Sequence, residues 1–184
     1  VRKVVDGIIS TVTAALAWPE GIAVDSAGNV FVADTGNHRI ARIDPSGAVT
    51  TVAGTLGRGG PAGDGGKATA AQLNSPYAVA VDKDGNIFIA DTRNNRIRKV
   101  DQTGMITTIA GVGSAGFGGD GGPATAAIVN EPQGIAVGPG GEVYVADTGN
   151  GRVREIKIDG MIITIAGDGA ADTRGIALDP SMPA

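Results

Sequence analysis

A chain of 184 residues is long enough to bury one sizeable hydrophobic core. Its net charge of −4 and aromatic content of 3% do not suit a protein that neutralises phosphates and stacks on bases, so we expect no nucleic-acid partner. No stretch approaches the roughly 20 apolar residues that cross a bilayer, which predicts no membrane span, and the absence of cysteine excludes disulfides and thiolate metal ligands.

The first predicted element is a pair of strands in residues 1–13. The 31 glycines and 9 prolines of the chain follow no three-residue period, which indicates many turns between short strands. The sequence of residues 1–13 resembles that of residues 97–110, which close a unit further along the chain. We therefore predict that residues 1–13 form the last two strands of a preceding unit.

Residues 19–54 form the first complete unit, in which four short β-branched runs alternate with Gly, Asn, Asp and Pro clusters. The four predicted strands are Gly21–Asp25, Val30–Asp34, Arg39–Asp44 and Val49–Ala53. The first two are apolar on both faces and require cover from neighbouring sheets, whereas the last two carry more polar residues. A four-stranded blade of a β-propeller, with its first strand at the central axis, meets both demands.

The same unit recurs in residues 76–111 and 132–167. Asp34 and Asp91 are 57 residues apart, and Asp91 and Asp147 are 56 apart. Residues 175–184 begin with a run that resembles the first strand of a following blade. The predicted fold class is an all-β propeller of four-stranded antiparallel blades, with about three complete blades and partial blades at both ends of one incomplete domain.

The block Ala-Asp-Thr-Gly-Asn-His-Arg-Ile at residues 33–40, followed by Thr-Thr-Val-Ala-Gly, resembles the NHL repeat. The Gly-Asp-Gly-Gly spacers at residues 63–76 and 119–132 are similar to those of bacterial members. The resemblance implies six blades in a complete propeller and an extracellular, periplasmic or cell-surface location. The chain has too few strands for six blades, so we expect self-association or further blades to cover its open ends.

The expected ligand surface follows from strand direction. Successive antiparallel strands place the connections between the second and third strands on the same side as the connections between blades, and this loop-rich face carries the longer loops. The candidate ligand residues on this face are His38, Arg39, Arg58, Asp64, Arg93, Asn95, Arg96, Phe117, Asp120, Asn150 and Arg152.

Several repeated residues are predicted to have structural roles. We expect Asp34, Asp91 and Asp147 to bond to backbone N–H groups two residues on. Arg39, Arg96 and Arg152 are expected to bridge to turn carbonyls or a neighbouring carboxylate, and Asp64 and Asp120 to order the start of a helical turn. Arg98 and Arg154 are placed on the solvent side of the third strand, and Trp18 and Tyr77 between blades.

No catalytic or metal-binding constellation is evident in the sequence. His38 is the single histidine, and its counterparts in the other units are Asn95 and Gly151, which indicates a tolerant loop position. We therefore predict a non-catalytic module that binds or scaffolds a protein or glycan and needs no cofactor. The alternative is a lyase or hydrolase whose metal site on the axis is completed by blades outside this chain, since resemblance extends to amidating lyases that use histidine ligands.

Overall fold

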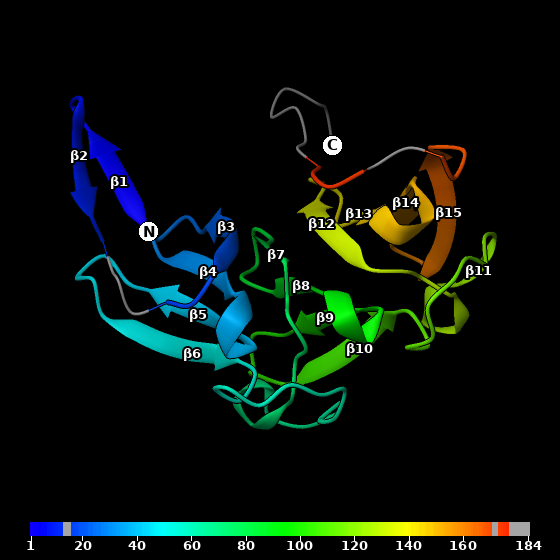
Figure 1. The fold of residues 1–184 in the computed structure, drawn as a ribbon, viewed down its shortest axis with the longest axis horizontal. Helices are drawn as coiled ribbons and strands as arrows, with labels where there is room; N and C mark the ends of the chain where they lie inside the picture. The colour runs from blue at the N-terminus through cyan, green and yellow to red at the C-terminus, as the bar shows by residue number, and fades with distance from the viewer. Residues whose placement is uncertain (13–15, 171–172, 177–184) are drawn as a thin grey trace.

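The computed structural model describes residues 1–12, 16–170 and 173–176, and it is an arc of small antiparallel sheets (Figure 1). The N-terminal sheet has two strands, β1 (Arg2–Val5) and β2 (Ile8–Thr11). Three larger sheets follow one another along the arc (Figure 1). The described residues include no helix long and apolar enough to cross a membrane.

Each larger sheet is a blade whose strands pair antiparallel in chain order. The first blade comprises β3 (Pro19–Val24), β4 (Val30–Asp34), β5 (Arg39–Ile43) and β6 (Val49–Ala53). The second comprises β7 (Ala78–Val81), β8 (Ile87–Asp91), β9 (Arg96–Val100) and β10 (Ile106–Ala110). The third comprises β12 (Pro132–Val137), β13 (Val143–Asp147), β14 (Arg152–Ile156) and β15 (Met161–Ala166). The predicted all-β propeller with four-stranded blades is confirmed.

The third strand of the first blade ends at Ile43, one residue earlier than predicted. Asp44 instead begins the turn, because its Oδ1 accepts hydrogen bonds from the N–H groups of Ser46 at 2.9 Å and Ala48 at 3.0 Å. The first strand begins at Pro19, two residues earlier than predicted. At the other end of the chain, residues 173–176 form no strand, and the rest of the predicted following blade, residues 177–184, lies outside the described residues.

Short 3₁₀ turns complete the secondary structure. Three of them, η1 (Thr35–Asn37), η3 (Thr92–Asn94) and η5 (Thr148–Asn150), join the second and third strands of the blades. Two more, η2 (Ala68–Ala70) and η4 (Ala124–Ala126), lie in the spacers and confirm the helical turns expected after the Asp-Gly-Gly motifs.

The hydrophobic core lies between blades rather than within any one of them. One cluster joins Phe31 and Ala33 of β4 to Val79 and Ile89 of the second blade. A second cluster repeats this contact between Phe88 of β8 and the third blade. The central strand β8 is buried on both faces because the first and third blades cover its two sides, as its unbroken apolar sequence indicates. In Figure 1 the first strands β3, β7 and β12 lie on the concave side of the arc.

The sequence predicted that the Gly-rich spacers are free loops on the loop-rich face. This prediction is wrong. Their middle parts run along the outer edge of the following blade. The Gly65 N–H donates to the Ile106 carbonyl of β10 at 2.8 Å, and the Ile106 N–H donates to the Gly66 carbonyl at 3.0 Å. In the second spacer, β11 (Gly122–Pro123) pairs with β15 as a fifth strand. This arrangement occurs because the edge of an outer strand leaves backbone groups that need partners.

Candidate ligand-binding site

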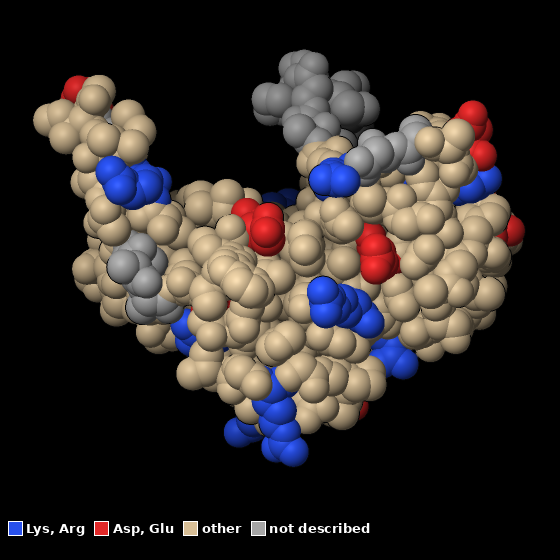
Figure 2. Space-filling view, viewed as in Figure 1, with Lys and Arg blue, Asp and Glu red and all other residues tan. Residues whose placement is uncertain are grey.

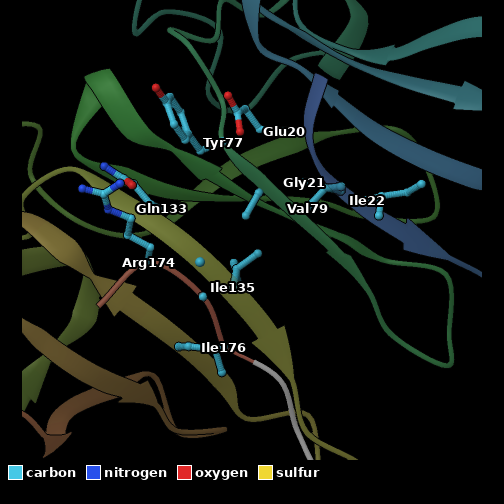
Figure 3. Close-up of a pocket in the computed structure, with 12 residues that line it drawn as sticks. Glu20, Gly21, Ile22, Tyr77, Val79, Gln133, Ile135, Arg174 and Ile176 are labelled. Atoms are coloured by element: carbon cyan, nitrogen blue, oxygen red, sulfur yellow. The ribbon is translucent and has the colours of Figure 1, made fainter. Parts of the chain in front are cut away.

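The concave side of the arc holds a polar cleft of about 550 Å³ at the position of the propeller axis. Its rim carries Glu20, Tyr77, Gln133 and Arg174 (Figure 3). The first three follow the repeat prolines Pro19, Pro76 and Pro132. Figure 3 shows these four side chains around the cleft, together with Val79 and Ile135, which also line it.

Arg174 occupies the same position relative to its neighbours as the other three rim residues. The Thr35 hydroxyl donates to the Pro76 carbonyl at 2.6 Å, and the Thr92 hydroxyl donates to the Pro132 carbonyl at 2.7 Å. The Thr148 hydroxyl donates in the same way to the carbonyl of Thr173, the residue before Arg174. One position of the repeat therefore supplies all four side chains.

Small residues next to the rim position let neighbouring inner strands approach each other closely. The Gly21 N–H donates to the Tyr77 carbonyl at 2.8 Å. A Cβ at Gly21 would lie 2.7 Å from Cα of Ala78, and one at Gly134 would lie 3.0 Å from the Arg174 carbonyl oxygen. The backbone around the cleft is thus fixed by glycine, while the adjacent rim position is free to vary.

The rim combines a carboxylate, a phenol, a carboxamide and a guanidinium, which together donate and accept hydrogen bonds and offer one aromatic surface. Sequence reasoning missed this group, and it wrongly placed Trp18 between blades. Trp18 is 81% exposed, and Tyr77 lines the cleft. The signal that would have found the site is the change of residue type after each repeat proline, where the flanking sequence hardly changes.

His38 has a structural role at the junction of the first two blades. Its Nδ1 accepts a hydrogen bond of 3.0 Å from the Ser75 N–H, and Oδ1 of Asn95 accepts the equivalent bond of 2.9 Å from Glu131. Ser75 and Glu131 have φ values of 48° and 45°, in the left-handed region that non-glycine residues rarely adopt. The loop of one blade thereby holds the turn that leads into the next.

Replacing His38 by glycine is expected to lower the free energy of unfolding by about 1–2 kcal/mol, because the Ser75 N–H loses its acceptor. Glycine adopts the φ of 56° at this position without strain, so the decrease in the free energy of unfolding measures the lost hydrogen bond. His38→Asn is the matched control and should be nearly neutral, since Asn95 makes the same bond in the next blade. Urea unfolding followed by circular dichroism measures both variants, and equal losses would contradict this role.

A buried ion-pair network occupies the second and third blades. Arg98 and Arg154 are fully buried, which corrects their expected place on the solvent side. Nη1 of Arg98 lies 3.2 Å from Oδ2 of Asp91, and Nη2 lies 2.8 Å from Oδ1 of the spacer residue Asp64. Arg154 repeats the arrangement with Asp147 at 3.5 Å and Asp120 at 2.7 Å. Each spacer aspartate therefore ties its loop to a blade by charge.

The first blade lacks this network. Ala41 stands where the other blades have the buried arginine, and Asp34 pairs instead with Nε of Arg39 at 2.7 Å. Arg96 and Arg152 bond to backbone carbonyls, those of Pro61 at 3.1 Å and Asn150 at 3.1 Å. The predicted bridging roles of these three arginines are confirmed.

The repeated aspartates do stabilise structure, but through more distant partners than predicted. Oδ1 of Asp34 accepts from the Ala17 N–H, Oδ1 of Asp91 from that of Asn74 and Oδ1 of Asp147 from that of Asn130, each at 2.7 Å. All three donors lie 17 residues earlier in the chain. The aspartate at the end of each second strand thus anchors the segment that enters its own blade.

Burial raises the pKa of Asp91 to about 6, although hydrogen bonds from Asn74 and Asn94 and the charge of Arg98 oppose the rise. The folded chain therefore binds this proton more tightly than the unfolded chain does. The contribution of Asp91 to the free energy of unfolding is largest below about pH 4 and decreases as the pH rises through 6. We expect the ¹³C carboxyl signal of Asp91 to titrate near pH 6.

Asp101 is the internal control for that titration, because a hydrogen bond from the Thr103 hydroxyl lowers its pKa below the usual 3.8. Both signals can be followed in one NMR series on the complete chain. A midpoint for Asp91 at or below that of Asp101 would show that burial does not control this carboxyl group.

The eleven predicted ligand-face residues do not form one site. Arg93 and Asn95 line a shallow polar hollow of about 400 Å³ with Asn74, Asn130 and Glu131. Phe117 lies 4.0 Å from the guanidinium of Arg152, measured to the ring centroid. Four others make the structural hydrogen bond and ion pairs described above: His38, Arg39, Asp64 and Asp120. Of the rest, Arg58 is exposed, Arg96 bonds spacer carbonyls and Asn150 bonds the Gly116 carbonyl at 2.7 Å.

Neither a concentrated basic patch nor a cluster of metal-ligating side chains marks a further site on the described residues. In Figure 2 the basic side chains are spread over the visible face and do not gather in one patch. The described part of the chain contains no group of three or more His, Cys, Asp or Glu side chains placed to hold a metal ion.

Comparison with known proteins agrees with the repeat and the fold. The model of the NHL repeat matches residues 16–43 and 129–156, and that of the teneurin NHL domain matches residues 57–118. The chain belongs to the NHL-repeat family. These matches together cover more than half of the chain and fall on all three complete blades.

The curated relatives of this NHL chain are much longer proteins. Teneurin-4 of Mus musculus is 34% identical over 171 residues, which is 83% of this chain and 6% of that protein. NHL repeat-containing protein 2 of Gallus gallus is 37% identical over 109 residues, which is 58% of this chain and 14% of that protein. The chain thus spans a small part of the length of either relative.

Solved structures share the fold at low sequence identity. An auxiliary nutrient binding protein from Bacteroides thetaiotaomicron has a TM-score of 0.65 at 15% identity, over 95% of this chain and 46% of its own. A streptogramin B lyase has a TM-score of 0.58 at 18% identity, over 83% of this chain and 41% of its own. Both binding proteins and enzymes are therefore built on this architecture.

Proposed function

We propose that this NHL chain is a non-catalytic binding module that receives a polar loop of a protein ligand in its axial cleft. The observation that carries the proposal is the rim of the cleft, where one repeat position supplies Glu20, Tyr77, Gln133 and Arg174. Four different polar groups on a constant backbone give a surface that selects a ligand by its hydrogen bonds and charge.

The fold of the site also favours recognition. The backbone hydrogen bond from Gly21 to the Tyr77 carbonyl links two of the inner strands, so the backbone that carries the rim needs little ordering when a ligand binds. Tyr77 supplies an aromatic surface with a polar tip, a residue type enriched at the centre of protein interfaces. The relatives named teneurin-4 and NHL repeat-containing protein 2 are much longer than the segments that match this chain, which is consistent with an NHL region that serves as a recognition or scaffolding part of a larger protein.

To test this proposal, the chain is first immobilised and used to capture binding proteins. The affinity of a purified partner is then measured by isothermal titration calorimetry. Tyr77→Ala and Gln133→Ala are expected to weaken binding by about tenfold or more. Arg58→Ala and Arg93→Ala, outside the cleft, are the matched controls and should bind like the parent chain. A glycan array with the same variants tests a sugar ligand. Binding that is unchanged in both cleft variants would refute the proposal.

The enzymatic alternative remains a metal-dependent lyase or hydrolase whose site is completed by additional blades. The solved lyase shares only the fold with this chain, at 18% identity. Elemental analysis of the protein with any additional blades present would distinguish the two functions. A stoichiometric metal ion lost on mutation of Glu20 would favour the enzyme over the binding module.

A further inference from the structure

The outer edge of the first blade differs from the outer edges of the other two blades. In the second and third blades a Gly-rich spacer runs along the last strand, at residues 65–68 and 121–124. These spacers belong to connections of 24 residues, 54–77, and 21 residues, 111–131. The connection that enters the first blade, 12–18, has seven residues and no Asp-Gly-Gly motif. It therefore supplies no such spacer for β6.

The backbone of β6 lacks the hydrogen bonds that a spacer makes. In the second blade the carbonyl and N–H of Ile106 bond to Gly65 and Gly66. Val49 is the counterpart of Ile106, and no spacer or loop within residues 1–12, 16–170 and 173–176 makes the equivalent backbone bonds to it. Val49 is half-buried, whereas Ile106 and Ile162 are fully buried. The edge of β6 can therefore accept a further strand.

A guanidinium and a hydroxyl group lie together beside this edge. Nη1 of Arg39 donates to Oγ1 of Thr51 at 2.9 Å, and the Arg39 side chain is 12% exposed. The equivalent threonine of the second blade, Thr108, donates to Oδ2 of Asp64 at 2.6 Å. Nη2 of Arg98 lies 2.8 Å from Oδ1 of the same carboxylate. The first blade thus presents the two groups that hold a spacer aspartate, although its arginine comes from a different repeat position.

We propose that the outer edge of β6 binds an extended segment of a partner protein, and that this segment carries an Asp-Gly-Gly motif. The two spacers define this chemistry. Gly65 and Gly121 each follow the aspartate with a φ of 76°, so the position after the aspartate favours glycine. Asp64 and Asp120 are already paired with arginines of the blades that their spacers cover, so a second copy of the chain has no such segment to donate.

The spacers also specify the contacts of the bound segment. It adds to β6 as an antiparallel strand, as β11 adds to β15, and exchanges backbone hydrogen bonds with Val49. Its aspartate accepts a hydrogen bond from the Thr51 hydroxyl and pairs with the Arg39 guanidinium, as the spacer aspartate does in the second blade. In Figure 1 β6 lies on the convex side of the arc, so binding here is independent of ligand binding in the axial cleft.

A peptide of residues 62–71 contains the motif and serves as the probe. Its dissociation constant for the 184-residue chain is measured from amide shifts in an NMR titration, which detects weak binding and also locates it. We expect the largest shifts at Val49 and Thr51. The peptide with Asp64→Asn, and separately the chain with Thr51→Val, should bind about fivefold or more weakly, because each change removes a hydrogen bond of the carboxylate. Thr107→Val changes an exposed threonine of β10 and should leave the affinity unchanged.

Two results would overturn the inference. One is the absence of shifts at millimolar peptide, shifts located away from β6, or an affinity that neither change alters. The other is sedimentation showing a dimer of the chain whose formation protects the Val49 amide from hydrogen exchange, because a second copy would then cover the edge. Circular dichroism verifies that Thr51→Val is folded, and the Asp64→Asn peptide tests the carboxylate without any change to the chain.

Discussion

Replacing Arg98 by methionine is expected to lower the free energy of unfolding by about 3–5 kcal/mol at pH 8. Methionine fills much of the space of the arginine stem, so the loss comes mainly from charge. Asp91 is fully buried, and at pH 8 it would either keep a negative charge without the guanidinium 3.2 Å away or take up a proton at a cost in free energy. Asp64 would also lose the contact that ties its spacer to the second blade. Urea unfolding followed by circular dichroism measures the change.

The pH dependence of the same variant identifies the cause. Burial already raises the pKa of Asp91 to about 6, and removing the positive charge of Arg98 raises it further. At pH 4.5 the carboxyl group is therefore neutral, and the cost of Arg98→Met should be smaller than at pH 8. Arg58→Met, at an exposed position, is the control and should change stability little at either pH. A cost independent of pH would assign the effect to packing.

The blade architecture was predictable because the apolar runs, the turn residues and the repeat spacing all indicate the same fold. Apolar β-branched runs such as Val30–Asp34 can be buried on both faces only between two sheets, and the turn clusters fix where each strand ends. Three copies at near-constant spacing then repeat the same local signal. The fold class and most strand positions followed directly from these patterns.

Contacts between segments far apart in the chain were not predictable in this way. Arg98 lies between Ile97 and Lys99 on a third strand and looks like a solvated residue, yet Asp64, 34 residues earlier, pairs with it. The cleft rim was missed for a similar reason. Its residues come from separate blades, and only the spatial arrangement of the inner strands brings Glu20, Tyr77 and Gln133 together.

Gly111→Ala is expected to destabilise the chain by about 2–5 kcal/mol, and Gly104→Ala by about 1–2 kcal/mol. Both glycines have left-handed φ values, 91° and 81°, so alanine carries a similar backbone strain at either site. At Gly104 an added Cβ meets no atom within 4 Å. At Gly111 it would meet the Asn95 carbonyl oxygen and would lie 2.9 Å from Cγ2 of Val129.

The difference between these two variants therefore measures how tightly the end of the last strand is packed against the connection between the second and third strands. Gly54 and Gly167 occupy the same repeat position and face the carbonyls of His38 and Gly151 in the same way. The carbonyl belongs to the residue at which each η turn ends, and the His38 and Asn95 side chains hold the next blade from there. Gly111→Ala should thus also expose the Glu131 amide to hydrogen exchange, while Gly104→Ala leaves that amide protected. Equal losses of stability in the two variants would mean that the left-handed backbone conformation alone, and not close packing, requires glycine at position 111.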